Sequence, residues 1–447
     1  SESRQPWPEI LLASGQDSGE RTCKVTTKYR WSGALLSAII GLIMAAAGSA
    51  RADVSIDDPF SLNDVIDTFV ERGDYPFVYV RLESFEGRVL YEHGSVNREL
   101  LPDADIDGQT WMRIWSMSKI VTISLAMDLV ESGEISFDDP VADYLPELAS
   151  LAVARGPDGV RLSTLAAGEA GCPLESEPAE TPITIRNLLN HTAGFYYAVT
   201  GIECLDSLTA AQDLPGAADS EEFLERLVEL PLIQQPGAAY YYGLNTTLLG
   251  LVLESATGDS LETLVAERIT KPLRIRGLQY TLPDQASLLP HFTGIDGSIR
   301  IAQPEELDIF GGSLPRYDRR NELRLGGEGM LATADGYADF LRMLGSGGIL
   351  RGQRFLEQSS INEMTAPHTL LDSPAGHNGY NIWVTNGSAP DGQAGLWMGG
   401  GYESTHFWVD PANEFVAVIM SQMHASPDTE RNRDQAIRNE VYSQISP

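Results

Sequence analysis

The sequence predicts an α+β fold, in which one antiparallel sheet flanked by helices carries both ends of the mature chain and a mostly helical domain lies between. Alternating apolar and polar residues predict strand hairpins near both ends, over 77–92 and over 405–420. The stretch from residue 140 to residue 330 is instead rich in proline, glycine and short helical patterns. Strands at the two ends with helices between them favour a single sheet built from both ends.

Composition narrows the class of partner before any motif is considered. The 447 residues are 43% hydrophobic, which is enough to bury a sizeable core, and the formal net charge is −32. So acidic a chain is not expected to bind nucleic acid or an anionic membrane surface. We divide it into an N-terminal extension with a signal peptide (1–52), a sheet domain (53–140 and 325–447) and a mostly helical domain (141–324).

Residues 1–52 have the pattern of a targeting segment. A basic stretch precedes an apolar run, and Ala50-Arg51-Ala52 forms a small-x-small cleavage site. We expect cleavage after Ala52 and a periplasmic or secreted mature protein with no stable membrane partner; the alternative is an uncleaved N-terminal anchor. Export places Cys172 and Cys204 in an oxidising compartment as a candidate disulfide, with two separate buried thiols as the alternative.

Local patterns predict the elements of the first part of the chain. The spacing of apolar residues predicts a helix over Ser61–Arg72. Strands are expected over Phe77–Leu82 and Arg88–Glu92, because a glycine-containing turn separates them. The apolar run Val121–Val130 predicts a helix that stops at Gly133.

The last part of the chain has equally clear patterns. An amphipathic helix is expected over Asp335–Leu344, closed by Gly345-Ser346-Gly347-Gly348. Thr405–Val409 and Phe415–Met420 are predicted to form the second hairpin. The pattern over Asp428–Ile445 predicts a terminal helix.

Ser116-Met117-Ser118-Lys119 is the segment with the clearest chemical meaning. The chain has only four lysines, and arginine occupies the other basic positions. A lysine retained beside a serine indicates a task that arginine cannot perform, namely the loss of a proton near neutral pH. Ser116 and Lys119 are three residues apart, so on a helix they lie on one face as a nucleophile and its base.

The residues around this pair support the same chemistry. Ser116 begins an apolar helix, whose free N–H groups and dipole favour developing negative charge. Trp115 and Met117 are apolar, so we expect partial desolvation to lower the pKa of Lys119 toward the range of a general base. The alternative is an ordinary N-cap serine on a surface helix. The sequence contains no G-x-S-x-G elbow and no paired-histidine metal motif, and neither a metal nor an organic cofactor is expected.

Four segments together resemble one protein superfamily. Trp111–Lys119 resembles the nucleophile segment of serine β-lactamases and penicillin-binding proteins, most of all that of class C β-lactamases and family VIII carboxylesterases. Ile183–Phe195 and Gly326–Thr333 resemble structural segments of the same branch, and Pro236–Asn245 resembles its tyrosine segment. The four matches follow the order of the family along the mature chain. The resemblance implies a β-lactamase/transpeptidase-like fold.

The resemblance also implies a catalytic tyrosine in a Y-x-N motif that follows Pro-Gly. Counting from Pro236, Tyr242 fits that position best and Tyr241 is the alternative. Tyr242 would exchange protons with the serine and the lysine, as a general base or as the acid for the leaving group. The asparagine position of the motif is then occupied by Leu244, which departs from the family pattern.

The third family motif is K-T-G or H-x-G in lactamases and peptidases, and often W-G-G in the esterases. Trp397-Met398-Gly399-Gly400-Gly401 matches it as W-x-G, with Trp397 at the lysine position and Gly399 as a further substrate contact. The resemblance implies an oxyanion hole formed by the backbone N–H groups of Ser116 and Gly400. The segment has one extra residue before the next strand, so Gly399 or Gly401 are alternatives for Gly400. A glycine-rich turn with Trp397 in the core is the other interpretation.

These departures indicate the class of substrate. A β-lactam or a D-Ala-D-Ala peptide presents a carboxylate, and Trp397 and Leu244 replace the lysine and asparagine that would help to hold it. The expected protein is a serine hydrolase that forms an acyl-enzyme, most of all a carboxylesterase for short-chain or aryl esters with weak β-lactamase activity. The alternatives are a class C-like β-lactamase, a D-amino-acid peptidase and a penicillin-binding sensor without turnover. The expected partner is a small-molecule ester or β-lactam.

Overall fold

The computed structural model describes residues 54–446 except for 157–161, 163–171, 173, 370–372, 374 and 390. The expected targeting segment, residues 1–52, lies outside the described residues. Among the residues that are described, no helix combines the length and the apolar character needed to cross a bilayer.

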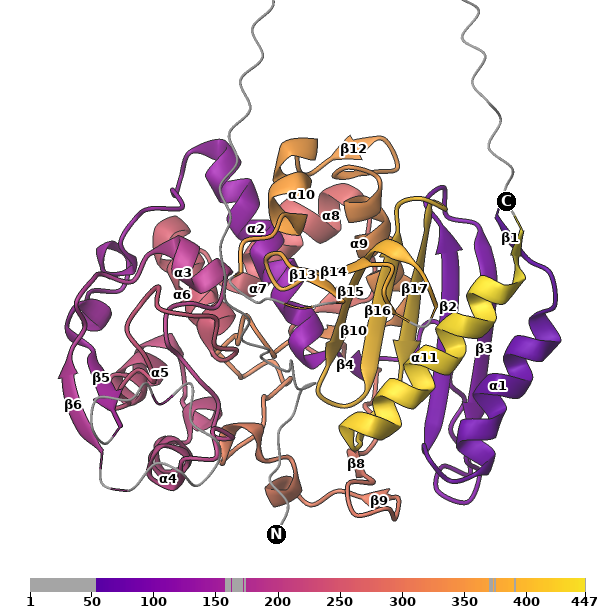
Figure 1. Ribbon diagram of the computed structural model, residues 1–447, viewed down its shortest axis with the longest axis horizontal. Coiled ribbons are helices and arrows are strands. Elements are labelled where there is room, and N and C mark those ends of the chain that lie inside the picture. The colour runs from indigo at the N-terminus through magenta and orange to yellow at the C-terminus, as the bar shows by residue number, and fades with distance from the viewer. Residues whose placement is uncertain are drawn as a thin grey trace, which may run out of the picture.

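A seven-stranded antiparallel sheet forms the right half of the molecule in the view of Figure 1, in the order β13-β14-β15-β16-β17-β2-β3. Its strands are β2 Phe77–Ser84, β3 Val89–Val96, β13 Gly376–Asn378, β14 Trp383–Asn386, β15 Ala394–Gly401, β16 Thr405–Asp410 and β17 Phe415–Met420. Because β17 pairs with β2, the two ends of the described chain meet side by side in the sheet. The α+β prediction and both predicted hairpins are confirmed, whereas no sequence pattern indicated β13 or β14.

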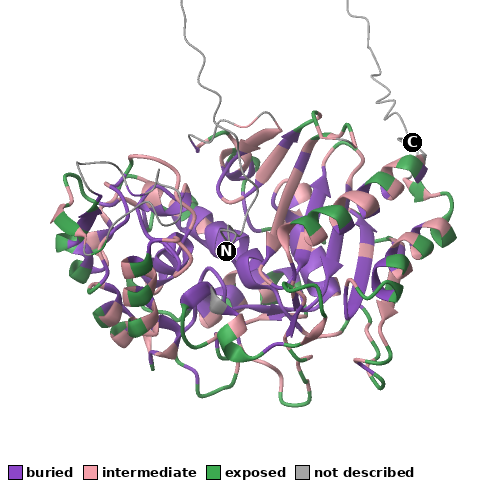
Figure 2. Ribbon diagram, turned by 60° about the horizontal axis from the view of Figure 1, so that its bottom comes forward, coloured by how far each residue is buried: buried purple, intermediate pink, exposed green. Residues whose placement is uncertain are grey.

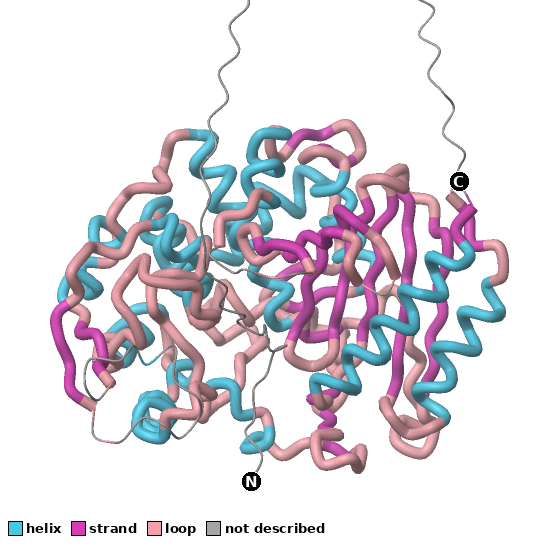
Figure 3. The backbone as a smooth tube through the Cα atoms, in the orientation of Figure 1, coloured by secondary structure: helices cyan, strands magenta, loops and turns pink. Residues whose placement is uncertain are grey.

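Helices cover both faces of this sheet (Figures 1 and 3). α1 (Pro59–Glu71) and α11 (Pro427–Gln444) lie together on one face, and α9 (Ala334–Gly345) lies on the other. The side chains of Asp58 and Ser426 accept hydrogen bonds from backbone N–H groups in the first turns of α1 and α11. All three helices were predicted, because the spacing of their apolar residues is a local signal.

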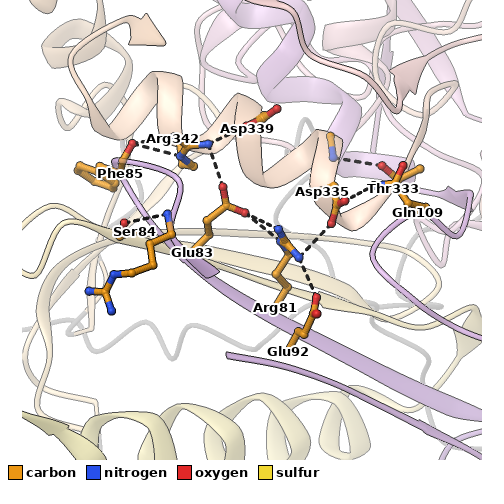
Figure 4. A network of polar contacts seen from close by, with 12 residues as sticks. Arg81, Glu83, Ser84, Phe85, Glu92, Gln109, Thr333, Asp335, Asp339 and Arg342 are labelled. Atoms are coloured by element: carbon orange, nitrogen blue, oxygen red, sulfur yellow. Dashed lines mark hydrogen bonds and ion pairs between the residues drawn. The ribbon is translucent and has the colours of Figure 1, made fainter. Parts of the chain in front are cut away.

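A network of charged side chains joins α9 to the sheet (Figure 4). Arg342 of α9 donates to Glu83 Oε1 of β2 at 2.8 Å and forms an ion pair with Asp339 at 2.7 Å. Arg81, also on β2, lies 2.8 Å from Glu83 and 3.1 Å from Asp335. Each of these charges has an opposite partner, so the network fixes how α9 sits on the sheet without leaving a buried charge unpaired.

α2 (Ser118–Ser132) is a buried helix at the centre of the molecule (Figure 2). It is buried around most of its circumference, as expected for a helix that is apolar on all sides. It ends where Gly133 takes a left-handed φ of +75°, which confirms the predicted end. α2 packs against α6 (Asn245–Thr257), which also packs against α3 (Ile185–Leu189), so α2 connects the sheet with the helix-rich part.

The segment between α2 and α9 consists mainly of short elements. Besides short 3-10 helices, its other helices among the described residues are α4 Glu203–Gln212, α5 Ser220–Leu227, α7 Leu261–Leu264, a π-helical turn Val265–Thr270 and α8 Lys271–Leu273. Its strands are β5 Ala152–Arg155, β6 Glu175–Pro178, β7 Leu278–Gln279, β8 Phe292–Thr293 and β9 Arg300–Ile301. Cys172 and Cys204 form a disulfide, so the alternative of two separate thiols is wrong.

Small sheets connect this segment with the rest of the chain. β10 (Leu331–Ala332) pairs with both β7 and β4 (Met112–Arg113), and β8 pairs with β18 (Met423–His424). The predicted boundaries between the sheet domain and the helical domain stay a prediction. The remaining elements are β1 Ser55–Ile56, β11 Ile349–Leu350, β12 Gln353–Arg354, α10 Gln358–Thr365 and β19 Ile445–Ser446.

Candidate active site

Ser116 lies in a single 3-10 turn, Trp115–Met117, directly before α2. Only 4% of Ser116 is exposed, and Lys119 in the first turn of α2 is fully buried. The Lys119 Nζ atom lies 3.2 Å from Ser116 Oγ, within hydrogen-bond distance. The structure therefore brings together the two residues whose spacing predicts a nucleophile and its partner.

The partners of Lys119 favour the positively charged form of its side chain. Besides Ser116, its Nζ atom lies 2.9 Å from Tyr197 OH, 3.0 Å from the Gly327 carbonyl oxygen and 3.1 Å from Glu328 Oε1. The Tyr197 hydroxyl donates its own proton to Glu328 Oε1, so its oxygen accepts from the lysine. The Ser116 hydroxyl can donate or accept, but the other three partners accept from Nζ, and an ammonium with its three N–H donors suits them.

Glu328 is the counter-charge of this ammonium. Its side chain is fully buried, and its second oxygen accepts a hydrogen bond from Thr247 at 2.6 Å. Burial by itself lowers the pKa of Lys119, but the Glu328 carboxylate, together with Tyr242, raises that pKa above its ordinary value. The sequence-based expectation of a lowered pKa is wrong, because the opposite charge comes from a residue 209 positions away.

The tyrosine segment brings Tyr242, and not Tyr241, to the ammonium. The Lys119 Nζ atom is 5.0 Å from the centroid of the Tyr242 ring. Tyr241 packs instead in a separate apolar cluster with Tyr196 and Leu205. Position alone therefore favours Tyr242 over its alternative as the residue that exchanges protons with the serine.

His191 supports the Tyr242 ring. The two rings are stacked, with centroids 4.9 Å apart and planes inclined by 19°. Burial, followed by the charge of Lys119, lowers the pKa of His191 to about 3, so its imidazole is neutral at physiological pH. Its Nδ1 atom lies 3.1 Å from the side-chain amide nitrogen of Asn245. His191 thus packs against the tyrosine without adding a second cation to the site.

β15 passes close to the nucleophile segment and carries the third motif. Side chains alternate along a strand, so Trp397, Gly399 and Gly401 share one face. On this face a Cβ atom at Gly401 would collide with the Ile114 carbonyl oxygen, so only glycine allows the approach. Pairing of β15 with β14 ends at Met398, whereas pairing with β16 continues to Gly401. The oxyanion hole stays a prediction. Its expected donors are the backbone N–H groups of Ser116 and Gly400.

Three side chains of the Lys119–Glu328 cluster were not included in the sequence-based prediction: Tyr197, Thr247 and Glu328. Glu328 had a usable signal, since a carboxylate within the small and apolar run Gly326–Thr333 indicates a buried charge in need of a partner. Tyr197 and Thr247 had none, because residues of their type are common in any core.

The groups gathered here are a serine hydroxyl, an ammonium and two phenols beside a glycine-rich strand. This set suits nucleophilic acyl transfer, in which a serine oxygen attacks a carbonyl and an acid–base group carries its proton. Within the described part of the chain, no three His, Cys, Asp or Glu side chains are arranged to hold a metal ion.

The family model described as Beta-lactamase matches residues 62–441. The Lovastatin esterase of Penicillium rubens is 24% identical over 393 residues, covering 81% of this chain and 92% of that protein. Esterase EstB of Burkholderia gladioli is 25% identical over 310 residues, covering 66% of this chain and 68% of that protein. The solved structure of EstCE1, described as a hydrolase with promiscuous acyltransferase activity, has a TM-score of 0.67 at 22% identity and covers 85% of this chain and 97% of that chain. This last likeness concerns the fold alone.

Proposed function

The chain belongs to the beta-lactamase family of serine hydrolases, and within that family we propose that it is a carboxylesterase acting on short-chain or aryl esters through an acyl-enzyme. The contact between Ser116 Oγ and the buried Lys119 ammonium carries this proposal. A serine oxygen beside a fixed positive charge is the group that acyl transfer requires. The esterases among the relatives support the choice of an ester as substrate.

In the first half-reaction, Ser116 Oγ bonds to the ester carbonyl carbon while its proton passes to the oxygen of Tyr242, which acts in this step as a phenolate beside the Lys119 ammonium. The Lys119 ammonium, 3.2 Å from Oγ, stabilises the negative charge that develops on the attacking oxygen. The backbone N–H groups of Ser116 and Gly400 are the proposed donors to the carbonyl oxygen, which becomes the oxyanion. The carbon–oxygen bond to the alcohol then breaks, and the alcohol leaves with the proton from Tyr242.

In the second half-reaction, water attacks the acyl-enzyme, Tyr242 takes a proton from the water and returns it to Ser116, and the acid is released. Lys119 acts throughout as a fixed cation and not as the base, because the Glu328 carboxylate raises its pKa. An alcohol in place of water would yield a new ester. A relative named Acyltransferase mokF of Monascus pilosus, 27% identical over 312 residues, favours this transfer as a second candidate function.

Trp397 and Leu244 support neutral esters over β-lactams as the main substrates. Trp397 is half-buried on β15 where lactamases have a lysine, and Leu244 is buried where they have an asparagine. A substrate carboxylate would lose a charge-assisted hydrogen bond at the lysine position, worth about 1.5–3 kcal/mol. We therefore propose weak β-lactamase activity beside the esterase activity.

Hydrolysis of p-nitrophenyl butyrate and of a chromogenic cephalosporin, by the wild type and by Ser116→Ala, tests the proposal. We expect rapid ester hydrolysis, slow cephalosporin opening and loss of both in the variant. Fast opening of the cephalosporin with slow ester cleavage would make the protein a class C-like β-lactamase. A stable adduct with one equivalent of product would make it a penicillin-binding sensor, and ester hydrolysis by Ser116→Ala would disprove the mechanism.

Periplasmic or secreted localisation is part of the proposal. The disulfide between Cys172 and Cys204 supports it, because such bonds persist in oxidising compartments. N-terminal sequencing of the mature protein is expected to start at Asp53, the residue after the proposed cleavage site. A mature protein that keeps the apolar run would instead support the membrane anchor.

A further inference from the structure

The residue before the nucleophile has a backbone conformation that few side chains tolerate. Trp115 has a φ of +46°, although it is a fully buried tryptophan. The left-handed region is unfavourable for any residue with a Cβ atom and most of all for a bulky one, so surrounding contacts have to maintain it. Because Ser116 follows directly, this backbone angle also sets the direction in which the serine enters the site.

Glu403 holds the side chain of this tryptophan. The Trp115 indole donates to Glu403 Oε2 at 2.7 Å, and the Glu403 side chain is not exposed at all. The other carboxylate oxygen lies 2.7 Å from Nδ1 of His291. The ring of Tyr402 packs edge-on against the indole, with centroids 5.3 Å apart. A hydrogen bond to a buried carboxylate is among the stronger contacts that a neutral donor can make.

The turn that carries Glu403 is itself held on several sides. The Glu403 carbonyl oxygen accepts from the Met423 backbone N–H at 3.1 Å. Ser404 donates to the Met423 carbonyl oxygen at 2.7 Å, and Arg433 of α11 donates to the Ser404 carbonyl oxygen at 2.9 Å. The turn begins directly after Gly401, which touches Ile114. The same turn, fixed by these hydrogen bonds, therefore ends the glycine-rich strand and anchors Trp115, the residue before the nucleophile.

We propose that Glu403 is a positioning residue for Ser116. Its carboxylate, held by His291, fixes the Trp115 indole and so maintains the left-handed backbone that aims the serine at the glycine edge of β15. This inference rests on the proposed function, because it requires Ser116 as the nucleophile. Glu403 acts through Trp115 and does not touch the substrate, so its loss affects the rate of acylation and leaves substrate binding unchanged.

Two variants of Glu403 separate this role from simple packing. Glu403→Gln keeps an oxygen that accepts from the indole, whereas Glu403→Ala removes it. We expect Glu403→Ala to lower kcat for p-nitrophenyl butyrate by about 10- to 100-fold with KM nearly unchanged, because small misplacements of reacting groups have effects of this size. Glu403→Gln is expected to keep most of kcat. Equal losses in both variants would overturn the proposal.

A double-mutant cycle tests whether Glu403 acts through the tryptophan. Trp115→Phe keeps a large ring and removes the N–H donor, so it should reduce kcat about as much as Glu403→Ala. The double variant Trp115→Phe/Glu403→Ala should be no slower than either single variant, because both changes break one contact. If the fold-loss of kcat in the double variant equals the product of the two single losses, the two residues act independently and the proposal is overturned.

A pair of variants that differ by one methyl group tests the backbone angle directly. Trp115→Gly and Trp115→Ala leave similar cavities, but only glycine adopts a positive φ without cost. We expect the glycine variant to have the higher kcat, about fivefold above the alanine variant, although glycine is elsewhere the less stabilising residue. An alanine variant as fast as the glycine variant would overturn the proposal. If neither folds, the cycle with Trp115→Phe decides.

Rates of the Trp115 and Glu403 variants are referred to active enzyme, counted by titration with a fluorophosphonate that labels the nucleophilic serine. The rate of Ser116→Ala is referred to total protein, and thermal unfolding of every variant is followed by circular dichroism. Ser116→Ala, measured alongside, separates the proposed function from the positioning role of Glu403. Activity in Ser116→Ala would disprove the proposed function itself. An inactive Ser116→Ala with independent effects of Trp115 and Glu403 would disprove only the positioning role.

Discussion

Two of the buried charge networks of this molecule use different cations for different purposes. Where α9 meets the sheet, Arg81 and Arg342 hold Glu83 between them (Figure 4). At the nucleophile the cation is Lys119, which also contacts the hydroxyl group of Ser116. An arginine is always charged and its planar fork suits carboxylates, whereas a lysine is a compact charge that fits beside a single oxygen.

The comparison explains why one of only four lysines lies here. The arginine network has to hold a helix against a sheet, which needs several directed contacts and no change of protonation. The lysine has to present one charge to a reacting oxygen, and Glu328 keeps that charge in place. Breaking either network should lower the free energy of unfolding, but only a change in the lysine network should lower the catalytic rate.

Removal of the reacting cation is expected to have the largest effect. Lys119→Met should lower kcat/KM for p-nitrophenyl butyrate by about 10³-fold or more, because the attacking oxygen of Ser116 loses its nearest positive charge. It should also destabilise the fold, since Glu328 becomes a buried unpaired charge. The double variant Lys119→Met/Glu328→Gln should recover stability in thermal unfolding but no activity. Recovered activity would contradict the role of the ammonium.

Breaking the arginine network should change stability alone. Arg342→Met leaves Glu83 with Arg81 alone and Asp339 with the more exposed Arg351, and the loss of its charge-assisted hydrogen bonds should cost about 1.5–3 kcal/mol of unfolding free energy. The value of kcat per folded molecule should not change. Arg351→Met is the matched control, because Arg351 pairs with Asp339 from an exposed position, 40% accessible, and should cost about 0–1 kcal/mol. Urea unfolding gives both energies, and a lower kcat in Arg342→Met would contradict the distinction.

Removal of the counter-charge should move the pH dependence. In the wild type Glu328 raises the pKa of Lys119 above 10.5, so the ammonium contributes stability through neutral pH, and that contribution is lost only as pH rises through the raised value. In Glu328→Gln burial dominates and lowers the pKa of Lys119. The alkaline limb of kcat/KM against pH should therefore move to lower pH, and activity at pH 8 should fall about 10-fold or more. An unmoved limb would show that the charge of Glu328 does not control Lys119.

The smallest effect is expected at Tyr197. Tyr197→Phe removes one hydrogen bond each to Lys119 and Glu328 but leaves their ion pair intact, so kcat should fall by about fivefold, equivalent to about 1 kcal/mol. Tyr196→Phe, in the separate apolar cluster, is the control and should leave kcat unchanged. Tyr242→Phe should reduce kcat far more than Tyr197→Phe. The reverse order would identify Tyr197 as the proton-transfer group.

The sequence predicted best what depends on near neighbours in the chain. The helices that became α1, α2, α9 and α11 have their own runs or spacing of apolar residues, and the two hairpins have their own turns. The β13 and β14 strands are three and four residues long and lie in an irregular stretch, so no periodicity could reveal them. The family resemblance, carried by short motifs, indicated the fold and the tyrosine segment before any contact was known.

What the sequence by itself determined is the pairing of Ser116 with Lys119, because a spacing of three residues on a helix brings two side chains to one face wherever the helix lies. Only the tertiary structure decided the charge of that lysine, since its counter-ion Glu328 comes from a distant segment. It also decided the left-handed backbone of Trp115, which is maintained by Glu403 from another part of the chain. Local geometry is set by neighbours in sequence, whereas the charge and strain of a buried group are set by neighbours in space.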